Sequence, residues 1–169
     1  MLIRAAVAAD VDAIGQVHVR TWQSAYRGHI PDAYLDGLDP SKRATMWSAA
    51  IRDPSTQVFV AMQGQALVGF CSVTPSRDSD AGADVAEITA IYVDLTCWRS
   101  GFGTRLLEAA VESAGQRRFK EITLWVLAAN VSARAFYEAR GFVADGVTKT
   151  EERLGFSLHE VRYRRMIAI

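Results

Sequence analysis

Residues 84–107, DVAEITAIYVDLTCWRSGFGTRLL, decide the fold of this chain. Alternating apolar residues up to Val93 predict a strand, a polar loop follows, and a helix begins through Gly101-Phe102-Gly103. Glycines let backbone N–H groups converge on an anion, and the first turn of a helix adds donors and the positive end of its dipole. The stretch therefore predicts a phosphate-binding turn, for which a diphosphate-bearing nucleotide cofactor is the natural ligand.

The spacing of the glycines narrows the class of cofactor. The dinucleotide fingerprint needs a third glycine three residues after the second, and this chain has Leu106 there. The ATP-type loop needs Gly, four residues and then Gly-Lys-Ser/Thr, a string that the sequence lacks. Two glycines alone are also typical of a plain tight turn from strand to helix, so the flanking residues must decide.

Those flanks resemble the GNAT superfamily of N-acetyltransferases, which bind acyl-coenzyme A. In that family an apolar strand leads into Gln/Arg-x-x-Gly-x-Gly/Ala and a helix. This chain has Ile91-Tyr92-Val93 followed by Trp98-Arg99-Ser100-Gly101-Phe102-Gly103-Thr104. Trp98 departs from the pattern, which has Gln or Arg at this place. Its side chain cannot donate to a phosphate as those two residues do. The resemblance implies that residues 99–104 cradle the diphosphate of acetyl-CoA. It also implies that the backbone of Ile91, Tyr92 and Val93 pairs with the pantetheine arm.

A second stretch matches the family at the right distance. Residues 121–127 have a strand pattern, Asn130 is a good N-cap, and Phe136-Tyr137 lies on the helix that Gly141 ends. Asn130 and Tyr137 are seven residues apart and so share one side of that helix. The resemblance adds both to the cofactor site, with Asn130 either capping its helix or bonding the pantetheine amides.

Acyl transfer to an amine needs a base for the ammonium proton and a proton for the leaving thiolate. We expect Tyr137 to be the proton donor, since a phenol with a pKa near 10 is protonated at neutral pH; the alternative is a core aromatic. Glu87 lies four residues before Ile91 on the strand that leads to the turn. In some members of the family a Glu at that spacing is the base. Otherwise Glu87 is a solvated carboxylate or attracts a cationic substrate.

The acceptor side is less defined by the sequence. Trp22, Tyr26 and Trp47 belong to N-terminal helices that, by the resemblance, roof the acceptor pocket. Their ring faces suit a cation, although aromatic residues at helical spacing are more often core. His18 is expected to be a surface or satisfied core residue, and Tyr163 to face the cavity or a subunit partner.

Composition favours one domain over residues 1–169, with 50% hydrophobic and 22% charged residues and a net charge of zero. This balance argues against a nucleic-acid or membrane-surface partner, and no apolar run reaches membrane-spanning length. Two cysteines, Cys71 and Cys97, are too few and too far apart for a disulfide framework or metal site, which indicates a reducing compartment, the cytoplasm. A homodimer is one assembly that this interpretation allows.

The patterns predict an α/β fold in the order β-α-α-β-β-β-α-β-α-β-β, with a short extra helix at Pro31. Expected helices cover 9–27, 39–51, 102–117 and 130–140, and expected strands cover 56–62, 66–73, 84–93, 121–127, 142–149 and 156–167. The same order is the family's fold, a mixed and mostly antiparallel central sheet with helices on both faces. The leading function is transfer of an acetyl group from acetyl-CoA to a small-molecule or protein primary amine, by direct attack in a ternary complex. The alternatives are a non-catalytic acyl-CoA sensor and, less compatible with Leu106, a nucleotide-dependent oxidoreductase.

Overall fold

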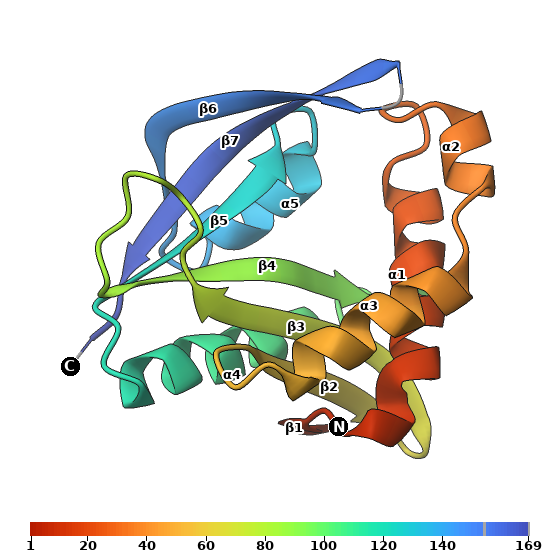
Figure 1. Ribbon diagram of the computed structural model, residues 1–169, viewed down its shortest axis with the longest axis horizontal. Helices are drawn as coiled ribbons and strands as arrows, with labels where there is room; N and C mark the ends of the chain where they lie inside the picture. Colours follow the sequence, from red (N-terminus) through yellow and green to blue (C-terminus); the bar gives the residue numbers. More distant parts are fainter. Residues whose placement is uncertain (154, 169) are drawn as a thin grey trace.

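The computed structural model describes residues 1–153 and 155–168 as a seven-stranded sheet with helices on both faces (Figure 1). The elements are β1 (Leu2–Ala5), α1 (Val11–Ala25), α2 (Asp32–Asp36), α3 (Pro40–Arg52), β2 (Gln57–Gln63), β3 (Ala66–Pro75), β4 (Val85–Val93), α4 (Phe102–Gln116), β5 (Glu121–Leu127), α5 (Val131–Glu138), β6 (Val143–Arg153) and β7 (Phe156–Met166). Short 3₁₀ turns, η1 (Ala8–Asp10) and η2 (Leu95–Cys97), precede α1 and α4. Among the described residues, no helix is long and apolar enough to cross a membrane.

The predicted fold is confirmed in its order and its mixed sheet. The strands lie side by side as β1-β2-β3-β4-β5-β7-β6, and every neighbouring pair is antiparallel except β4 and β5, which are parallel. The main differences lie at element ends. The helix expected over residues 9–27 begins only at Val11, after η1, and β6 continues to Arg153 instead of ending at residue 149.

Helical periodicity decides which faces of the sheet are covered. On α1, Ile14, Val17 and Thr21 recur at the three-to-four-residue spacing and are buried against the sheet. Ile14 and Val17 belong to one apolar layer with Trp47 of α3 and Phe70 of β3. A larger layer on the opposite face joins α4 and α5 to the sheet through Leu106, Leu107, Ala110, Tyr137 and Phe142.

The β6–β7 hairpin reaches across the molecule to α2 (Figure 1). Leu158 of β7 packs there with Ile30 and Leu35, and Phe156 stacks edge-on against Tyr34 with ring centroids 5.1 Å apart. This third apolar cluster joins the end of the hairpin to the N-terminal helices.

Candidate active site

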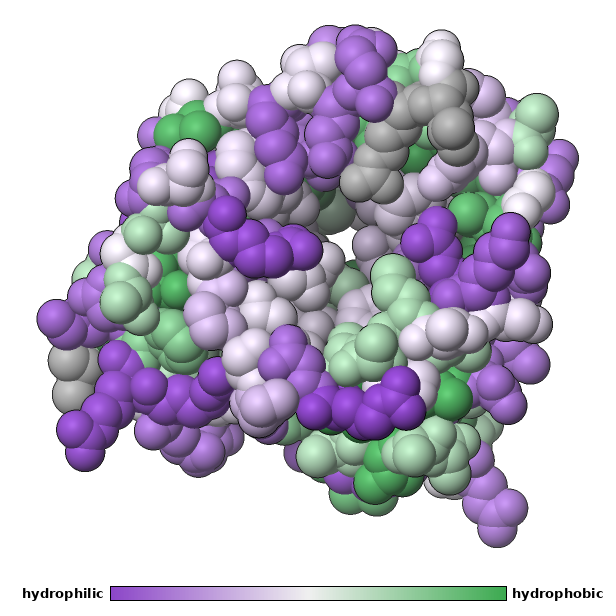
Figure 2. All heavy atoms as spheres, in the orientation of Figure 1, coloured by the Kyte–Doolittle hydropathy of each residue, from purple (hydrophilic) through white to green (hydrophobic). Residues whose placement is uncertain are grey.

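Strands β4 and β5 pair over only part of their length. Their parallel register runs from Val85–Glu121 to Ile88–Leu124 and then stops. Thr89 is an extra residue in β4, since β3 pairs Ser72 with Ala90 but Val73 with Ile88. Beyond this bulge, β4 from Thr89 to Val93 and the end of β5 line a cleft of about 920 Å³. Figure 2 shows the same face hollowed at its centre. The edge of β4 that β5 leaves here includes Ile91, Tyr92 and Val93, whose backbone the resemblance predicts to pair with the pantetheine arm.

The glycine turn lies at one end of the cleft and has two separate structural reasons. Gly101 is the N-cap of α4 with φ 84°, a left-handed conformation that glycine adopts without strain. A Cβ on Gly103 would lie 3.3 Å from Phe136 Cζ, so the second glycine lets α4 approach α5 closely. Arg99 also adopts a left-handed φ, 59°. Arg99, Gly101, Gly103 and Thr104 all line the cleft, in front of the first turn of α4.

Two side chains at this end were not predicted as contacts. Trp98 is half exposed, and its Nε1 donates to the Val93 carbonyl at 2.7 Å, which joins the turn to the end of β4. Arg140 donates through Nε to Thr104 Oγ1 at 2.9 Å, and its guanidinium lies 3.9 Å above the Phe136 ring centroid. Both line the cleft. The signal that could have found Arg140 was its place four residues, or one helical turn, after Phe136.

Tyr137 lines the cleft from α5. Its ring is buried, and that burial raises the pKa of the phenol, so the hydroxyl is protonated at neutral pH. Asn130 is the N-cap of the same helix, where its side-chain oxygen accepts from Ala133 N–H at 3.1 Å. The capping role leaves the Asn130 amide nitrogen for a second contact, and the side chain also lines the cleft.

Glu87 lines the cleft from β4 and is almost fully buried, with 3% exposure. Both of its carboxylate oxygens accept from Arg77: Oε2 from the backbone N–H at 3.0 Å, and Oε1 from Nη2 at 2.9 Å. Of the alternatives for Glu87, the solvated carboxylate is therefore wrong, because the loop before β4 folds over it. Arg77 was not predicted, since sequence spacing carries no signal for a contact between a loop and a strand ten residues apart.

The α1 side of the cleft holds two of the three aromatic residues that were predicted for the acceptor pocket. Trp22 and Tyr26 line it, edge to face with ring centroids 5.0 Å apart, and the side chain of Tyr92 joins them. Trp47 does not line the cleft in the described structure. The prediction for Trp47 is therefore wrong. Its side chain is 5% exposed, packs in the core and donates Nε1 to His18 Nδ1 at 2.9 Å. His18 is buried beside Trp47, which is the predicted alternative of a core histidine with a hydrogen-bond partner.

Tyr163 also differs from expectation. It faces neither the cleft nor the surface, because it is fully buried and bonded to α5. Its hydroxyl donates to Glu138 at 2.6 Å and accepts from Arg134 Nε at 3.0 Å. Two predicted cofactor contacts lie outside the described lining of the cleft: Ser100 is exposed on the turn, and the Phe102 side chain is buried in the core.

The wall opposite α1 comes from β5, β6 and β7 and is charged. Lys149 Nζ lies 4.2 Å from the Trp125 ring centroid and 3.6 Å from Glu160. Trp125 in turn donates Nε1 to Asp78 at 3.0 Å, and Arg162 also pairs with that carboxylate. This wall is thus assembled from the loop before β4 and the last hairpin together.

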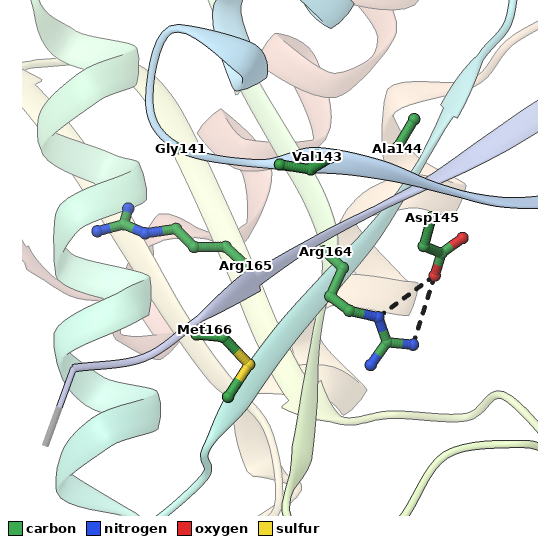
Figure 3. Close-up of a pocket in the computed structure, with 7 residues that line it drawn as sticks. All are labelled: Gly141, Val143, Ala144, Asp145, Arg164, Arg165 and Met166. Atoms are coloured by element: carbon green, nitrogen blue, oxygen red, sulfur yellow. Dashed lines mark hydrogen bonds and ion pairs between the residues drawn. The ribbon is translucent and has the colours of Figure 1, made fainter.

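A second hollow, of about 500 Å³, lies where β6 begins and β7 ends. Figure 3 shows Arg164 directed toward Asp145 and Arg165 directed away from that pair. Among the described residues it shares no lining residue with the cleft, and it contains none of the predicted site residues.

Comparison with known proteins gives one consistent result. Residues 18–142 match the acetyltransferase (GNAT) family. The chain is 34% identical over 139 residues to the uncharacterized N-acetyltransferase YuaI of Bacillus subtilis, covering 81% of this chain and 77% of that protein. It is 30% identical over 168 residues to the probable N-acetyltransferase Rv2775 of Mycobacterium tuberculosis, covering 96% and 91%.

Solved structures share the fold. The PaiA N-acetyltransferase of Thermoplasma acidophilum, in complex with coenzyme A, superposes with a TM-score of 0.77 at 19% identity, over 98% of both chains. YncA of Salmonella typhimurium, a putative acetyltransferase solved with acetyl-CoA, gives 0.76 at 19% identity, over 100% of this chain and 95% of that one. With most of its length matched by the family and its fold shared with these enzymes, the chain belongs to the GNAT family of acetyltransferases.

Proposed function

We propose that this acetyltransferase moves an acetyl group from acetyl-CoA to a primary amine, by direct attack within a ternary complex. The observation that carries the proposal is the single cleft between β4 and β5, which has the glycine turn at one end and Trp22 and Tyr26 at the other. Donor and acceptor can occupy such a cleft together, and their reacting atoms would meet near its middle. The acyl donor, acetyl-CoA, fits the residues present.

Three groups of this chain fit the cofactor. Backbone donors at the start of α4 and the guanidinium groups of Arg99 and Arg140 suit a diphosphate. The edge of β4 that β5 leaves from Thr89 to Val93 offers backbone groups to the two amides of a pantetheine arm, as a neighbouring strand would. A backbone N–H near Ile91 or Tyr92 would polarise the thioester carbonyl.

Tyr137 and Glu87 carry the proton transfers in this proposal. Tyr137 gives its hydroxyl proton to the departing thiolate from α5, on one side of the cleft. Glu87 takes the proton of the attacking ammonium directly or through water, and Arg77 holds its carboxylate in place. If Glu87 does not accept that proton, its negative charge still attracts the cationic amine. The thiols of Cys71 and Cys97 are both free and buried, which fits a protein of the reducing cytoplasm. In this proposal the chain acts as a monomer or as a homodimer.

The diphosphate cradle can be tested without disturbing packing. Gly103→Asp would mix charge with a clash against Phe136. Gly101 is better, because Asp and Asn tolerate a left-handed φ, have nearly the same shape and differ by one negative charge. We expect Gly101→Asp to bind acetyl-CoA at least about tenfold more weakly than Gly101→Asn in calorimetry. Equal affinities for the two variants would contradict the cradle.

Turnover is tested by thiol release from acetyl-CoA over a panel of primary amines, with a thermal-shift panel of acetyl-CoA, NAD and ATP. The proposal expects stabilisation by acetyl-CoA and amine-dependent thiol release. Stabilisation without release for any amine would favour the acyl-CoA sensor. Stabilisation by NAD alone would favour the oxidoreductase.

A further inference from the structure

The acceptor end of the cleft is lined on the α1 side by hydrogen-bond donors. His18, Thr21 and Trp22 lie three and four residues apart on one face of α1. His18 Nε2, Thr21 Oγ1 and Trp22 Nε1 are buried and have no well-formed hydrogen bond among residues 1–153 and 155–168, and the Tyr92 phenol is close enough to interact with the Trp22 side chain. Thr21 and Trp22 line the cleft, whereas His18 lies behind them and stacks on Tyr92 with ring centroids 5.2 Å apart.

The tautomer of His18 makes its Nε2 a donor as well. Trp47 Nε1 donates to His18 Nδ1 at 2.9 Å, so Nδ1 is the accepting nitrogen. Burial lowers the pKa of His18 to about 3, and the nearby Arg43 charge acts in the same direction, so the ring is neutral. A neutral imidazole that accepts at Nδ1 carries its hydrogen at Nε2. This side of the cleft therefore offers an indole N–H and a hydroxyl at its surface, with an imidazole N–H behind them.

Buried donors call for an acceptor atom. A polar group that leaves water without a partner costs free energy, so such a cluster is stable in a bound complex when the ligand accepts from it. An ammonium group only donates and cannot serve. Arg43 adds positive charge, with its guanidinium 5.8 Å from the Trp22 ring centroid. The α1 side thus suits an anionic oxygen, and a carboxylate offers several lone pairs.

The strand side has the opposite character. Glu87 of β4, Glu151 of β6 and Glu160 of β7 line the same cleft. Arg77 and Lys149 pair with Glu87 and Glu160, and the carboxylate oxygens of this wall have further lone pairs that can accept from the N–H groups of an amine. Donors on one side and carboxylates on the other match a ligand whose own charges are separated in the same way.

The geometry points to a free amino acid, a zwitterion whose carboxylate accepts from Thr21 and Trp22 while its amine faces Glu87 and the thioester. This inference rests on the proposed function, because it names the acceptor of the same acetyl transfer. It distinguishes a free amino acid from an amine without a carboxylate and from an internal protein lysine, whose neighbouring groups are neutral amides.

Matched acceptors test it directly. Thiol release is measured with L-leucine, L-methionine and L-phenylalanine, each beside its amide and its decarboxylated amine. We expect kcat/KM for at least one acid to exceed those of its amide and amine by about tenfold or more, because the latter leave the donors without an acceptor. Amides or amines used as well as the acids, or no acid used, would overturn the inference. If no compound reacts and acetyl-CoA does not stabilise the protein, the proposed function itself has failed.

Thr21→Val gives a second test that does not depend on a folding defect. Valine has nearly the same shape, and removal of a buried hydroxyl should leave the melting temperature unchanged or higher. We expect KM for the preferred amino acid to rise about tenfold, with KM for acetyl-CoA and for the matching amide unchanged. Thr45→Val is the matched control, a helical threonine whose hydroxyl donates to Ser41 on α3. A purely structural Thr21 would not change the ratio of acid to amide turnover, and an unchanged ratio would overturn the contact.

Discussion

Trp98 donates its indole N–H to the carbonyl of Val93, the last residue of β4, over 2.7 Å. The bond fixes the distance between the glycine turn and the strand edge that would hold the pantetheine arm. The one side chain that departs from the family pattern is thus part of how this chain builds its turn. Trp98 lines the cleft while 45% of its surface stays exposed.

Trp98→Phe should therefore weaken acetyl-CoA binding while it keeps an aromatic ring. Loss of one hydrogen bond of roughly 1 kcal/mol corresponds to about a fivefold higher Kd in calorimetry. The control is Leu95→Ala, in the adjacent 3₁₀ turn η2 and with a side chain 50% exposed, which should bind acetyl-CoA as the wild type does. An unchanged Kd for Trp98→Phe would show that the turn holds its position without the bond.

Tyr137→Phe should lower kcat by about 100- to 1000-fold, with the affinity for acetyl-CoA nearly unchanged. The deficit should shrink as the pH rises through about 8.5, near the pKa of a free thiol, because a thiolate leaves then without a donor. The control is Tyr163→Phe, which removes a buried phenol in ring contact with Tyr137, bonded to Glu138 and outside the described cleft lining. Melting temperatures separate lost chemistry from lost folding, and wild-type turnover in Tyr137→Phe would return the residue to the core.

Glu87→Gln should distinguish the two roles left open for this carboxylate. A general base is needed least at a pH at which the amine is already neutral. The variant should therefore lose about 100-fold in kcat/KM at neutral pH, and this loss should shrink as the pH rises toward the pKa of the amine. Glu151→Gln is the comparison, since it removes another negative charge from the cleft lining. A constant deficit in both variants across the pH range would mean that Glu87 only attracts the substrate.

His18 should make the protein less stable in weak acid. Its pKa is about 3 in the folded protein and near 6.5 in the unfolded chain, so on acidification the unfolded state binds the proton first. The contribution of the neutral His18 imidazole to the free energy of unfolding is complete above about pH 6.5. It declines down to about pH 3, with about 2 kcal/mol lost at pH 5. His18→Gln, which keeps an acceptor for Trp47, should remove that part of the decline in urea unfolding at pH 7.5 and 5. Parallel declines in both proteins would contradict the burial of a neutral imidazole.

Local patterns carried most of the fold. Strand 84–93, the glycine turn and the segment from 121 to Gly141 follow from short-range periodicity and capping residues, and the structure shows each of them within a few residues of the expected ends. Helical spacing also placed Trp22 and Trp47 on buried faces. It could not choose between core and cleft for them, because that depends on where α1 and α3 cross the sheet.

Contacts between distant segments were the part that the sequence did not reveal. Arg77 reaches Glu87 from a loop, and Thr21 lines the cleft although a threonine on a helix face has no special signature. His18 was a core candidate without a partner until the fold placed Trp47 beside it. In each case the partner is set by tertiary packing, which leaves no periodic trace in the sequence.

The early end of the β4–β5 ladder has a consequence for how the molecule resists opening. Four residue pairs join the half-sheet β1–β4 to the half-sheet β5–β7, so this seam has fewer backbone hydrogen bonds than its neighbours. A cofactor lying along residues 89–93 would act as a temporary strand across it, and its binding energy would add to the cooperativity of unfolding. Amide exchange in this stretch would then slow more than elsewhere as acetyl-CoA is added. The protein would be most rigid at the moment when both substrates are in place.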